Sequence, residues 1–507
     1  MKLRQAISIL TMPFSFNGKG TRPDMDSIWQ RCTVTLDKGK LYSHIQTVLQ
    51  NPDPASESGY IIYSLSDKAT HIKNLIKRDI HLITKDNEGQ TKVVEFKFGQ
   101  AEDGKIDNQT FFSPKLLIHP SSNVGMLILS CCLADRNRTM EDLITLNYCI
   151  HRTFPAGSGQ NKVLKIKQLD QDNSRDSISE DTDMKTVRTQ KLQALMKNVF
   201  GTEDAFSMSM FTEILMAEFK GKYERFDPFR LHLFTYLQMS EPSDKVDLLK
   251  DFSRIIKLQN RNYKVVDSDK ADSVFEQIFK NIYVGSAVEG GGMMTLLSDQ
   301  DDDSCFLKDF HRSSLSQIYL WIYFMVQIQK YTLISIERSL TDYDFTNKNT
   351  NESRKKLAEL IASLTKNKIN SHFVSISSHT QHNKFYSLCC KNLDIERLSA
   401  GLNQKISYFK EHLDILTNEE EVRLAKIEND ISKRREDSMT ALTVVASAMA
   451  LFSVAYDSFG LLDESHFMLY HTADTEPWIR NLTVISVVAI VAAIAWAVTR
   501  LFLRRKR

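Results

Sequence analysis

The polar side chains with the clearest spacing lie in an uncharged run near the C-terminus, Ser438–Tyr456. Thr440, Thr443 and Ser447 recur at steps of three and four, which places such residues on one face of a helix. Rings of hydroxyl groups, with a carboxylate from Asp457, suit a hydrated cation, and an apolar ring can gate by dewetting. The same hydroxyl groups can instead bond to backbone carbonyls or to a neighbouring helix. The candidate pore-lining residues are Thr440, Thr443, Ser447, Leu451, Val454 and Asp457.

A second cluster of carboxylates lies near the middle of the chain. Asp299, Asp301 and Asp303 alternate like the start of a calcium-binding loop. However, Ser304 stands where that loop needs glycine, and Phe310 stands where it needs a bidentate glutamate. We therefore interpret this segment as an acidic surface turn.

A run of glycines, Gly290–Gly292, follows the strand-like residues Ile282–Val284. Glycines let backbone amides approach a phosphate, but the lysine-containing pattern of a P-loop is missing, so a flexible turn is the alternative. We keep Gly291 as a candidate ligand-binding residue. No nucleophile–base or metalloprotease spacing occurs in the sequence, so we do not predict an enzyme.

The composition suits two or three domains and an additional membrane part. The chain has 507 residues, 42% of them hydrophobic, and a mean hydropathy of −0.30. The net charge of +2 gives no reason to expect direct binding of nucleic acid. The seven cysteines include two adjacent pairs and no Cys-x-x-Cys, which predicts a reduced compartment without a disulfide framework or zinc site.

Two uncharged stretches, 438–456 and 481–499, have about the ~20 residues that a helix needs to cross a membrane. Lys433–Arg435 precede the first stretch, basic residues including Arg504–Arg507 follow the second, and the segment between them is mainly acidic. Because basic flanks stay in the cytoplasm, we expect a transmembrane hairpin with both chain termini inside.

A long helix leads into the first stretch, because neither proline nor glycine occurs between Leu402 and Phe459. Its first part is amphipathic, with apolar residues mostly three or four positions apart. Small and hydroxylated residues in the first stretch suit an inner helix, and the bulkier second stretch suits an outer helix. A single hairpin cannot enclose a pore, so several copies would have to form a ring.

The first part of the chain alternates between strand and helix patterns. Thr139 and Asp142 form a capping-box pattern that starts a helix ending near Arg152. The aromatic run Ser313–Gln329 contains three glutamines, and we expect a buried helix there rather than a third span. The expected strands are Ile7–Phe16, Tyr60–Leu65, Lys92–Phe98, Met126–Leu133 and Leu231–Leu237.

The arrangement of a long helix that runs into a span beginning Met439-Thr440-Ala441-Leu442-Thr443-Val444, then a second span and a basic tail, resembles the CorA family. That family consists of homopentameric divalent-cation channels with an N-terminal cytoplasmic α/β domain. Its inner helix ends in Gly-Met-Asn, whereas this chain has Tyr456-Asp457-Ser458-Phe459-Gly460. The resemblance implies the architecture but not selectivity for magnesium.

A narrower resemblance concerns the CorA-like effectors associated with type III CRISPR systems of Bacteroidetes. It rests on Val124–Ile128, Glu141–Asn147, His151–Pro155 and Gly290–Ile336. These effectors are thought to respond to a nucleotide messenger formed from S-adenosylmethionine and ATP. The resemblance implies that His151 and Arg152 fill the places of a basic pair and that Asp227 fills an acidic position. The candidate ligand-binding residues are Arg152, His151, Asn147, Asp227 and Gly291.

Arg152 is the residue that we expect to reach a phosphate, because a guanidinium makes two fixed hydrogen bonds to one. The alternative is that Arg152 only caps the C-terminus of its own helix.

The predicted fold is an α+β cytoplasmic domain followed by a stalk helix and a two-helix transmembrane hairpin, CorA-like and homopentameric. The predicted parts are an N-terminal α/β domain at 1–165, a polar linker at 166–183, a mainly helical second part with some strand at 184–390, a stalk helix at 391–437 and the hairpin with its basic tail at 438–507.

The predicted function is a channel in the bacterial inner membrane, gated by a messenger of the S-adenosylmethionine–AMP type in antiviral defence. The expected partners are further copies of the chain, the lipid membrane and the small messenger. No cofactor is predicted, although a divalent cation is a candidate permeant ion. The alternatives are a constitutive divalent-cation transporter and a membrane-anchored scaffold that conducts nothing.

Overall fold

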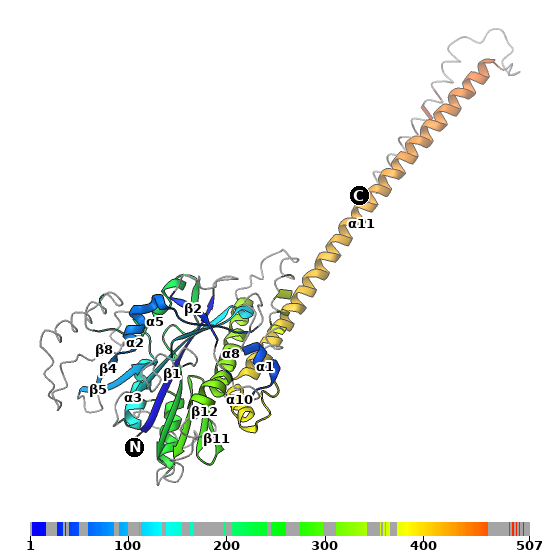
Figure 1. Cartoon of the computed structure of the whole chain (residues 1–507). Helices are drawn as coiled ribbons and strands as arrows, with labels where there is room; N and C mark the ends of the chain where they lie inside the picture. Colours follow the sequence, from blue (N-terminus) through cyan, green and yellow to red (C-terminus); the bar gives the residue numbers. More distant parts are fainter. Residues whose placement is uncertain are drawn as a thin grey trace, which may run out of the picture. The chain divides into compact units, whose positions relative to one another are not determined.

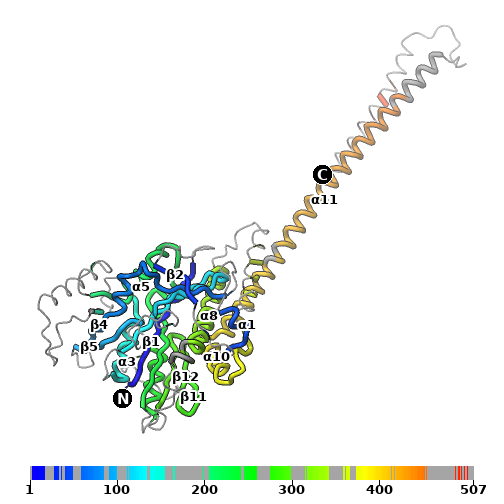
Figure 2. The backbone as a smooth tube through the Cα atoms, in the orientation of Figure 1, coloured from blue at the N-terminus to red at the C-terminus, as the bar shows by residue number. Residues whose placement is uncertain are grey.

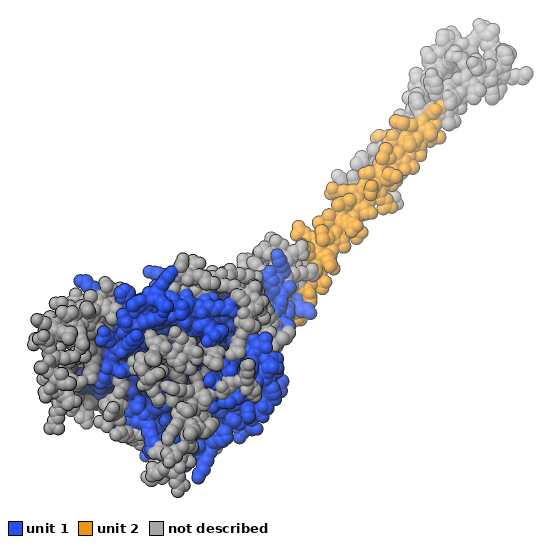
Figure 3. Space-filling model, in the orientation of Figure 1, with its two compact units in different colours: residues 1–410 blue, residues 411–507 orange. Residues whose placement is uncertain are grey.

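The computed structural model divides the chain into two compact units, Met1–Lys410 and Glu411–Arg507 (Figure 3). The residues that the structure describes are 3–16, 28–33, 36, 40–49, 59–85, 91–99, 111, 113–133, 138–154, 163–166, 197, 205–240, 245–259, 274–297, 311–341, 355, 358–359, 361–362, 364–365, 373–464, 486, 489–490, 493, 496 and 500.

The first unit is a mixed α/β fold built on one 13-stranded sheet. The main path of the sheet runs β11-β12-β13-β10-β1-β7-β5-β4-β8, with β2, β3 and β6 branching from β7 and with β9 beside β1. The strands are β1 Leu3–Phe16, β2 Trp29–Cys32, β3 Ile61–Leu65, β4 Asp79–Lys85, β5 Thr91–Phe98, β6 Lys115–His119, β7 Val124–Leu133, β8 Val163–Ile166, β9 Tyr223–Arg225, β10 His232–Ser240, β11 Phe275–Phe279, β12 Ile282–Ser286 and β13 Gly290–Leu297.

Strand β1 lies between β7 and β10 in the middle of this sheet (Figures 1 and 2). Thr11 of β1 is opposite His232 of β10, and both partners of β1 run antiparallel to it. Nearly every residue of β1 is buried, which agrees with its largely apolar sequence. Because β7 precedes the predicted linker and β10 follows it, the parts predicted at 1–165 and 184–390 share one sheet.

The helices cover both faces of the sheet. Most are short, and a stretch of π-helix, η6, precedes α8. They are α1 Ser43–Leu49, η1 Asp67–Ala69, α2 Thr70–Ile76, η2 Pro120–Ser122, α3 Met140–Ile150, α5 Met208–Leu215, η4 Ala217–Phe219, α6 Val246–Ile256, η6 His311–Tyr319, α8 Leu320–Thr341, α10 Thr380–Asn392 and α11 Ile395–Glu464.

The glycines of β13 show which helix lies on which face. A Cβ atom on Gly291 would lie 2.9 Å from the ring of Tyr323 in α8, whereas one on Gly292 would lie 3.1 Å from Phe252 in α6. Neighbouring residues of a strand point to opposite faces, so α6 and α8 lie on opposite sides of the sheet. The prediction of a flexible turn at Gly290–Gly292 is therefore wrong: these residues form a buried strand on which helices pack closely.

Several expectations from the sequence are confirmed. Thr139 and Asp142 form a reciprocal capping box at the start of α3, as the pattern predicts. The aromatic run Ser313–Gln329 lies in η6 and α8, and most of its side chains are buried. The five expected strands correspond to β1, β3, β5, β7 and β10.

Helix α11 is continuous over 70 residues, and it extends past Tyr456, where the first uncharged stretch ends. Thr440, Thr443 and Ser447 donate hydrogen bonds to the backbone carbonyls four residues earlier, at 2.7–2.8 Å. Bonding to backbone carbonyls is the role that the sequence allows for these hydroxyl groups as the alternative to lining a pore. Leu451 is exposed, and the side chains of Val454 and Asp457 lie outside the described residues.

The predicted transmembrane hairpin is corrected, because among the residues that the structure describes no helix is long and apolar enough to cross a membrane. Most of the second stretch, 481–499, lies outside those residues. The first stretch is simply a continuation of α11. A lack of charge over 19 residues does not by itself define a span, since small and hydroxylated side chains also satisfy that criterion. The predicted pore depends on this hairpin and is corrected with it.

Other predictions fall on residues that the structure does not describe. They include the acidic turn at Asp299–Asp303, the linker 166–183 beyond its first residue, and the helix expected at 184–200 apart from Lys197.

The packing of α8 on β13 predicts that a methyl group at position 291 is destabilising. Gly291→Ala places a Cβ against Tyr323 and Phe234, which must shift, so we expect a loss of about 1–3 kcal/mol in the free energy of unfolding. Gly401→Ala in α11 is the matched control, because a Cβ there meets nothing within 4 Å, and alanine favours helix by up to about 1 kcal/mol. Urea unfolding followed by circular dichroism measures both. Equal midpoints for the two variants would contradict this packing.

Candidate functional site

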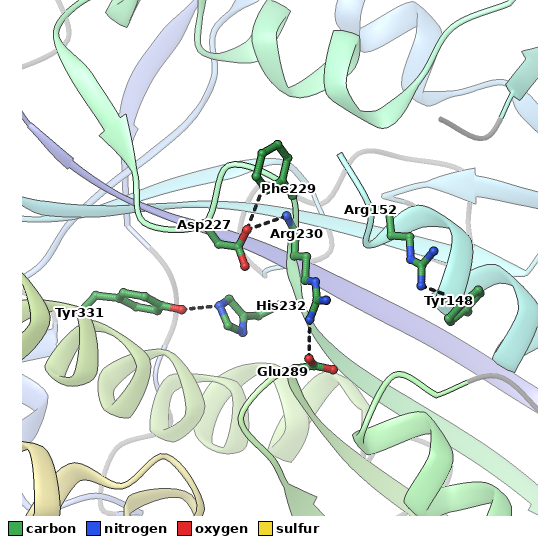
Figure 4. A network of polar contacts seen from close by, with 8 residues as sticks. All are labelled: Tyr148, Arg152, Asp227, Phe229, Arg230, His232, Glu289 and Tyr331. Atoms are coloured by element: carbon green, nitrogen blue, oxygen red, sulfur yellow. Dashed lines mark hydrogen bonds and ion pairs between the residues drawn. The ribbon is translucent and has the colours of Figure 1, made fainter. Parts of the chain in front are cut away.

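Two segments far apart in the sequence pair beside the N-terminal end of β10. The amide of Thr153 donates to the carbonyl of Phe229 at 2.8 Å, and the amide of Leu231 donates to the carbonyl of His151 at 2.7 Å. These bonds form an antiparallel bridge between Arg152 and Arg230. Arg152, which the sequence places at the end of its helix, and the segment that contains Asp227 are thus brought together (Figure 4).

Three arginines surround the paired segments, and we refer to Arg152, Arg225 and Arg230 as the arginine cluster. A guanidinium nitrogen of Arg225 donates to the hydroxyl of Thr153 at 2.6 Å. Arg230 pairs with Glu289 at 2.6 Å, but both side chains are about half exposed, so this ion pair adds little stability. Neither Arg152 nor Arg225 forms an ion pair with any residue that the structure describes. The cluster therefore consists of three cations, of which Arg230 alone is in an ion pair with a described residue, although the charges of Asp227 and Glu213 also act on Arg225.

Arg152 is held by Tyr148, one helical turn earlier in α3. Its guanidinium carbon lies 4.2 Å from the centre of the tyrosine ring, and one of its nitrogens donates to the tyrosine hydroxyl at 2.6 Å. A cation over an aromatic face is stabilised by the ring quadrupole. Arg152 keeps further N–H groups for a ligand, because a guanidinium has five in total. The C-terminal cap of α3 is His151, and the hydrogen-bond partner of the Arg152 side chain is Tyr148, so Arg152 does not have the capping role that the sequence allows as its alternative.

His151 takes that capping role instead. Its Nδ1 lies 3.0 Å from the carbonyl oxygen of Asn147 and donates to it, which leaves only Nε2 for another partner. The ring is buried, and burial lowers the pKa of His151 to about 4, with further lowering by the charges of Arg152 and Arg230. His151 is therefore neutral at pH 7 and adds no charge to the cluster.

Both the oxygen and the nitrogen of the Asn147 side-chain amide form hydrogen bonds inside the core. Its Oδ1 accepts a hydrogen bond from Ser8 of β1 at 2.5 Å, and its Nδ2 donates to Thr235 of β10 at 2.9 Å. Gly291 lies in β13 under α8. Arg152, His151 and Asp227 thus lie on the two paired segments. Asn147 does not lie there but joins α3 to β1 and β10, and Gly291 lies in β13 against α8.

Asp227 shapes the turn that leads to Arg230. Its Oδ1 accepts the amide hydrogens of Phe229 at 2.8 Å and of Arg230 at 3.1 Å, as in an Asx turn. Below this turn the Nε2 of His232 contacts the hydroxyl of Tyr331 in α8. Burial lowers the pKa of His232 to about 4, the charge of Lys330 lowers it further, and the charge of Asp227 opposes the shift.

We call residues Tyr223–Arg230 the strap, because they lead from β9 to β10. The strap also contacts α8 through Arg338, which lies 3.4 Å from a carboxylate oxygen of Glu224. The guanidinium of Arg338 stacks on the ring of Phe226, with its carbon 5.0 Å from the ring centre. The strap is thus fixed to α3 on one side and to α8 on the other.

A cavity of about 790 Å³ lies beside the strap. It is bounded by α5, η4 and strap residues, and Arg338 completes its lining. This volume is within the range of about 300–1,000 Å³ that is usual for small-molecule sites. No pattern in the sequence indicates this cavity.

Arg225, Arg230 and Tyr148 are not among the residues predicted from the sequence. The signal for the first two is the dense alternation of aromatic and charged residues in the strap, Tyr-Glu-Arg-Phe-Asp-Pro-Phe-Arg. The signal for Tyr148 is its position four residues before Arg152, which places the two side chains on one face of a helix.

No family model matches the chain, and no curated protein or solved structure matches it. The resemblance to CorA-like effectors therefore stays a prediction from the motifs. What the arrangement offers chemically is a set of guanidinium groups, two of them without a carboxylate partner in the described residues, beside a cavity of ligand size. Such groups bind phosphate or carboxylate.

The buried histidines predict a loss of stability at mildly acidic pH. Burial lowers the pKa of His151, His232 and His382 to about 4 each, below the value of about 6.5 of an unfolded chain. As pH falls from 6.5 towards 4 the unfolded chain binds protons that the folded chain does not, so stability present above pH 6.5 is lost. Each histidine should contribute about 1–2 kcal/mol of this loss at pH 5.

Urea unfolding at pH 7, 6 and 5, followed by the fluorescence of the buried Trp29 and Trp321, measures the effect. His232→Gln should be less sensitive to pH than the wild type, whereas His71→Gln, at an exposed position in α2, should match it. Identical pH dependence in the wild type and His232→Gln would contradict a neutral, buried His232.

Proposed function

We propose that the chain is a ligand-responsive effector whose first unit binds a phosphate-containing nucleotide messenger at the arginine cluster. The observation that carries the proposal is the pairing of 151–153 with 229–231. The resemblance to CorA-like effectors implicates Arg152 and Asp227 independently, and these residues are 75 positions apart in the sequence. Their meeting at one place supports a shared binding site.

The chemistry of the cluster supports an anionic ligand. Arg152 is oriented by Tyr148 before any ligand arrives, so little side-chain freedom is lost on binding. A guanidinium presents parallel N–H groups that match two phosphate oxygens. On the resemblance, we take the messenger to be the conjugate of S-adenosylmethionine and AMP, and the setting to be type III CRISPR antiviral defence.

The strap also offers a connection from the cluster to α11. Tyr331 and Arg338 of α8 contact His232 and the strap, and Glu337 of α8 pairs with Lys405 near the start of α11. A ligand that moves the strap would therefore act on α8 and on the first turns of α11. This is a proposed route based on contiguous contacts; coupling itself requires two states that bind the ligand differently.

We further propose that α11 mediates assembly of several copies of the chain, as the sequence predicts. Leu424, Ile427 and Ile431 recur at steps of three and four along the helix and are 46–60% exposed. Leu442, Val445 and Met449 repeat the same steps and are 52–69% exposed. Apolar residues at this spacing form the seam of a coiled coil when copies of a helix associate. The proposal does not include a transmembrane hairpin or the multi-pass location that depends on one.

The first prediction tests the ligand. Arg152→Ala removes the guanidinium proposed to bind a phosphate, and loss of a charge-assisted hydrogen bond costs about 1.5–3 kcal/mol, or roughly 10- to 150-fold in affinity. Isothermal titration calorimetry with the S-adenosylmethionine–AMP conjugate measures the dissociation constant. Arg397→Ala is the control, because this arginine is 80% exposed and pairs only with Asp394 in a short-range contact. Wild-type protein that does not bind the conjugate, or an Arg152→Ala affinity within twofold of wild type, would refute the proposal.

The second prediction tests assembly. Leu424→Glu with Ile431→Glu places two carboxylates in the proposed seam and should shift the chain to lower mass in light scattering after size-exclusion chromatography. Ala425→Glu with Ser432→Glu adds the same charge about 100° away around the helix and should leave the mass unchanged. A wild-type chain that is monomeric, or equal masses for both double variants, would overturn this part of the proposal.

A further inference from the structure

A serine–histidine arrangement lies in the short turn between β6 and β7. These two strands pair antiparallel, with His119 of β6 opposite Val124 of β7. Between them lies the single turn η2, Pro120–Ser122, and Asn123 closes it with a left-handed φ of 54°, which asparagine tolerates better than most residues. The hairpin therefore keeps His119 close to the two serines of the turn.

The turn and the histidine ring are both fixed by their neighbours. The amide of Asn123 donates to the carbonyl of Pro120 at 3.3 Å, and its carbonyl accepts from the amide of Phe16 in β1 at 2.9 Å. The ring of His119 lies against Tyr60, with the ring centroids 4.9 Å apart, and His119 is only 1% exposed. Both serines of the turn are partly exposed. A serine at the surface thus adjoins an imidazole with a defined position.

The hydrogen bonds of the two serines identify the tautomer of His119. The hydroxyl of Ser122 donates its single hydrogen to the carbonyl oxygen of His119 at 3.2 Å. The Nδ1 of His119 lies 2.8 Å from the same hydroxyl oxygen, so Nδ1 must donate to it. In a neutral imidazole with a hydrogen on Nδ1, the other nitrogen, Nε2, is an acceptor. The hydroxyl oxygen of Ser121 lies 3.2 Å from Nε2, so Ser121 donates to it.

This geometry is the one that activates a serine as a nucleophile. Such sites have a hydroxyl within about 2.6–3.2 Å of a base, and a third group orients the base. Here Ser121 is the hydroxyl, Nε2 of His119 is the base and Ser122 is the orienting group. The three residues lie within four consecutive positions, so no spacing typical of serine hydrolases indicates them in the sequence.

Another serine–histidine contact in the described part of the chain has a different character. The hydroxyl of Ser377 lies 3.0 Å from Nδ1 of His382. However, Ser377 is 1% exposed, and its hydroxyl donates to the carbonyl of Lys40. Its hydrogen is therefore directed to the backbone rather than to the imidazole, and a substrate does not reach it.

We propose that Ser121 is a nucleophile that carboxylic esters acylate. The hydroxyl oxygen of Ser121 attacks the ester carbonyl carbon, and its proton passes to Nε2 of His119. The bond between this carbon and the alcohol oxygen breaks, and the leaving alcohol takes the proton, so that an acyl-serine remains. Water then attacks the acyl-serine and gives a proton to Nε2. The bond to Ser121 breaks, the serine oxygen takes that proton, and the carboxylic acid is released.

The inference goes beyond the proposed function and does not rest on it. It also replaces the expectation from the sequence that the chain is not an enzyme. The site belongs to the β6–β7 turn and uses none of the residues of the arginine cluster.

A fluorophosphonate probe on the full chain tests the inference, because it forms a stable bond to a serine that a neighbouring base activates. Intact-mass spectrometry should show one phosphonyl adduct on the wild type, and peptide mapping should place it at Ser121. Ser121→Ala should remove the adduct. Ser122→Ala should slow labelling at least about tenfold, because the imidazole loses the group that fixes its tautomer. Ser122→Thr keeps a hydroxyl and should retain the wild-type rate.

Ser339→Ala is the matched control, since this exposed serine of α8 bonds only to the backbone of its own helix. It should be labelled like the wild type, and circular dichroism checks that each variant is folded. As a second readout, p-nitrophenyl acetate should release p-nitrophenol and leave an acetyl group on Ser121 of the wild type.

Equal labelling of the wild type and Ser121→Ala, or a wild-type chain that gains neither adduct, would overturn the inference. Equal labelling rates for the wild type and Ser122→Ala would contradict the tautomer on which the activation of Ser121 depends. A chain that binds the conjugate of S-adenosylmethionine and AMP but gains no adduct would leave the proposed function intact and remove only this site.

Discussion

The burial of β1 on both faces of the sheet is the constraint on which the arginine cluster depends. Its register with β10 places His232 opposite Thr11, so the strap, which precedes His232 in the chain, ends beside Thr11 of β1. Asn147 then fixes α3 over the same strands through hydrogen bonds to Ser8 and Thr235. Because Arg152 follows Asn147 by little more than one turn of helix, its position is determined by these two buried hydrogen bonds. An amide buried in this way is costly to leave unpaired, so α3 has one register on the sheet.

The position of the cluster at the edge of the sheet explains why Arg152 and Arg225 form no ion pair with a described residue. The guanidinium groups belong to residues at the edge of the core, where Tyr148 and Thr153 supply a ring face and a hydroxyl but no carboxylate. Burial keeps His151 and His232 neutral at pH 7, so these two side chains add no further positive charge to the cluster. Asp227 uses one of its oxygens to hold the turn. The backbone and the sheet therefore provide the stability, and the arginines are left to interact with something outside the fold.

Much of the fold could be predicted from local patterns. The capping box at Thr139 depends on residues three positions apart, and the aromatic run in α8 is recognisable from its composition. Gly290–Gly292 show the limit of this approach: glycines suggest a turn locally, but here they allow α6 and α8 to pack closely on a strand. The pairing of 151–153 with 229–231 and the cavity beside the strap depend on long-range packing, which a single sequence does not encode in readable form. The predicted transmembrane hairpin rests on two uncharged stretches and the charges that flank them, whereas a span also requires a helix that is long and apolar enough, which the described residues do not contain.

Coupling between the cluster and α11 has a physical requirement that the contacts alone do not fulfil. A ligand shifts an equilibrium only by the difference between its affinities for two states. Under the proposed function, an anion bound at the arginine cluster is one source of such a difference, because guanidinium groups bind phosphate or carboxylate. The strap would then favour one arrangement with ligand and tolerate others without it. The strap contacts α8 through Tyr331 and Arg338, and Glu337 of α8 pairs with Lys405 of α11, so these contacts form the proposed route between the cluster and α11. Exposed ion pairs such as Glu337–Lys405 contribute little by themselves, so the packed contact of Tyr331 with His232 is the stronger candidate for transmitting the change.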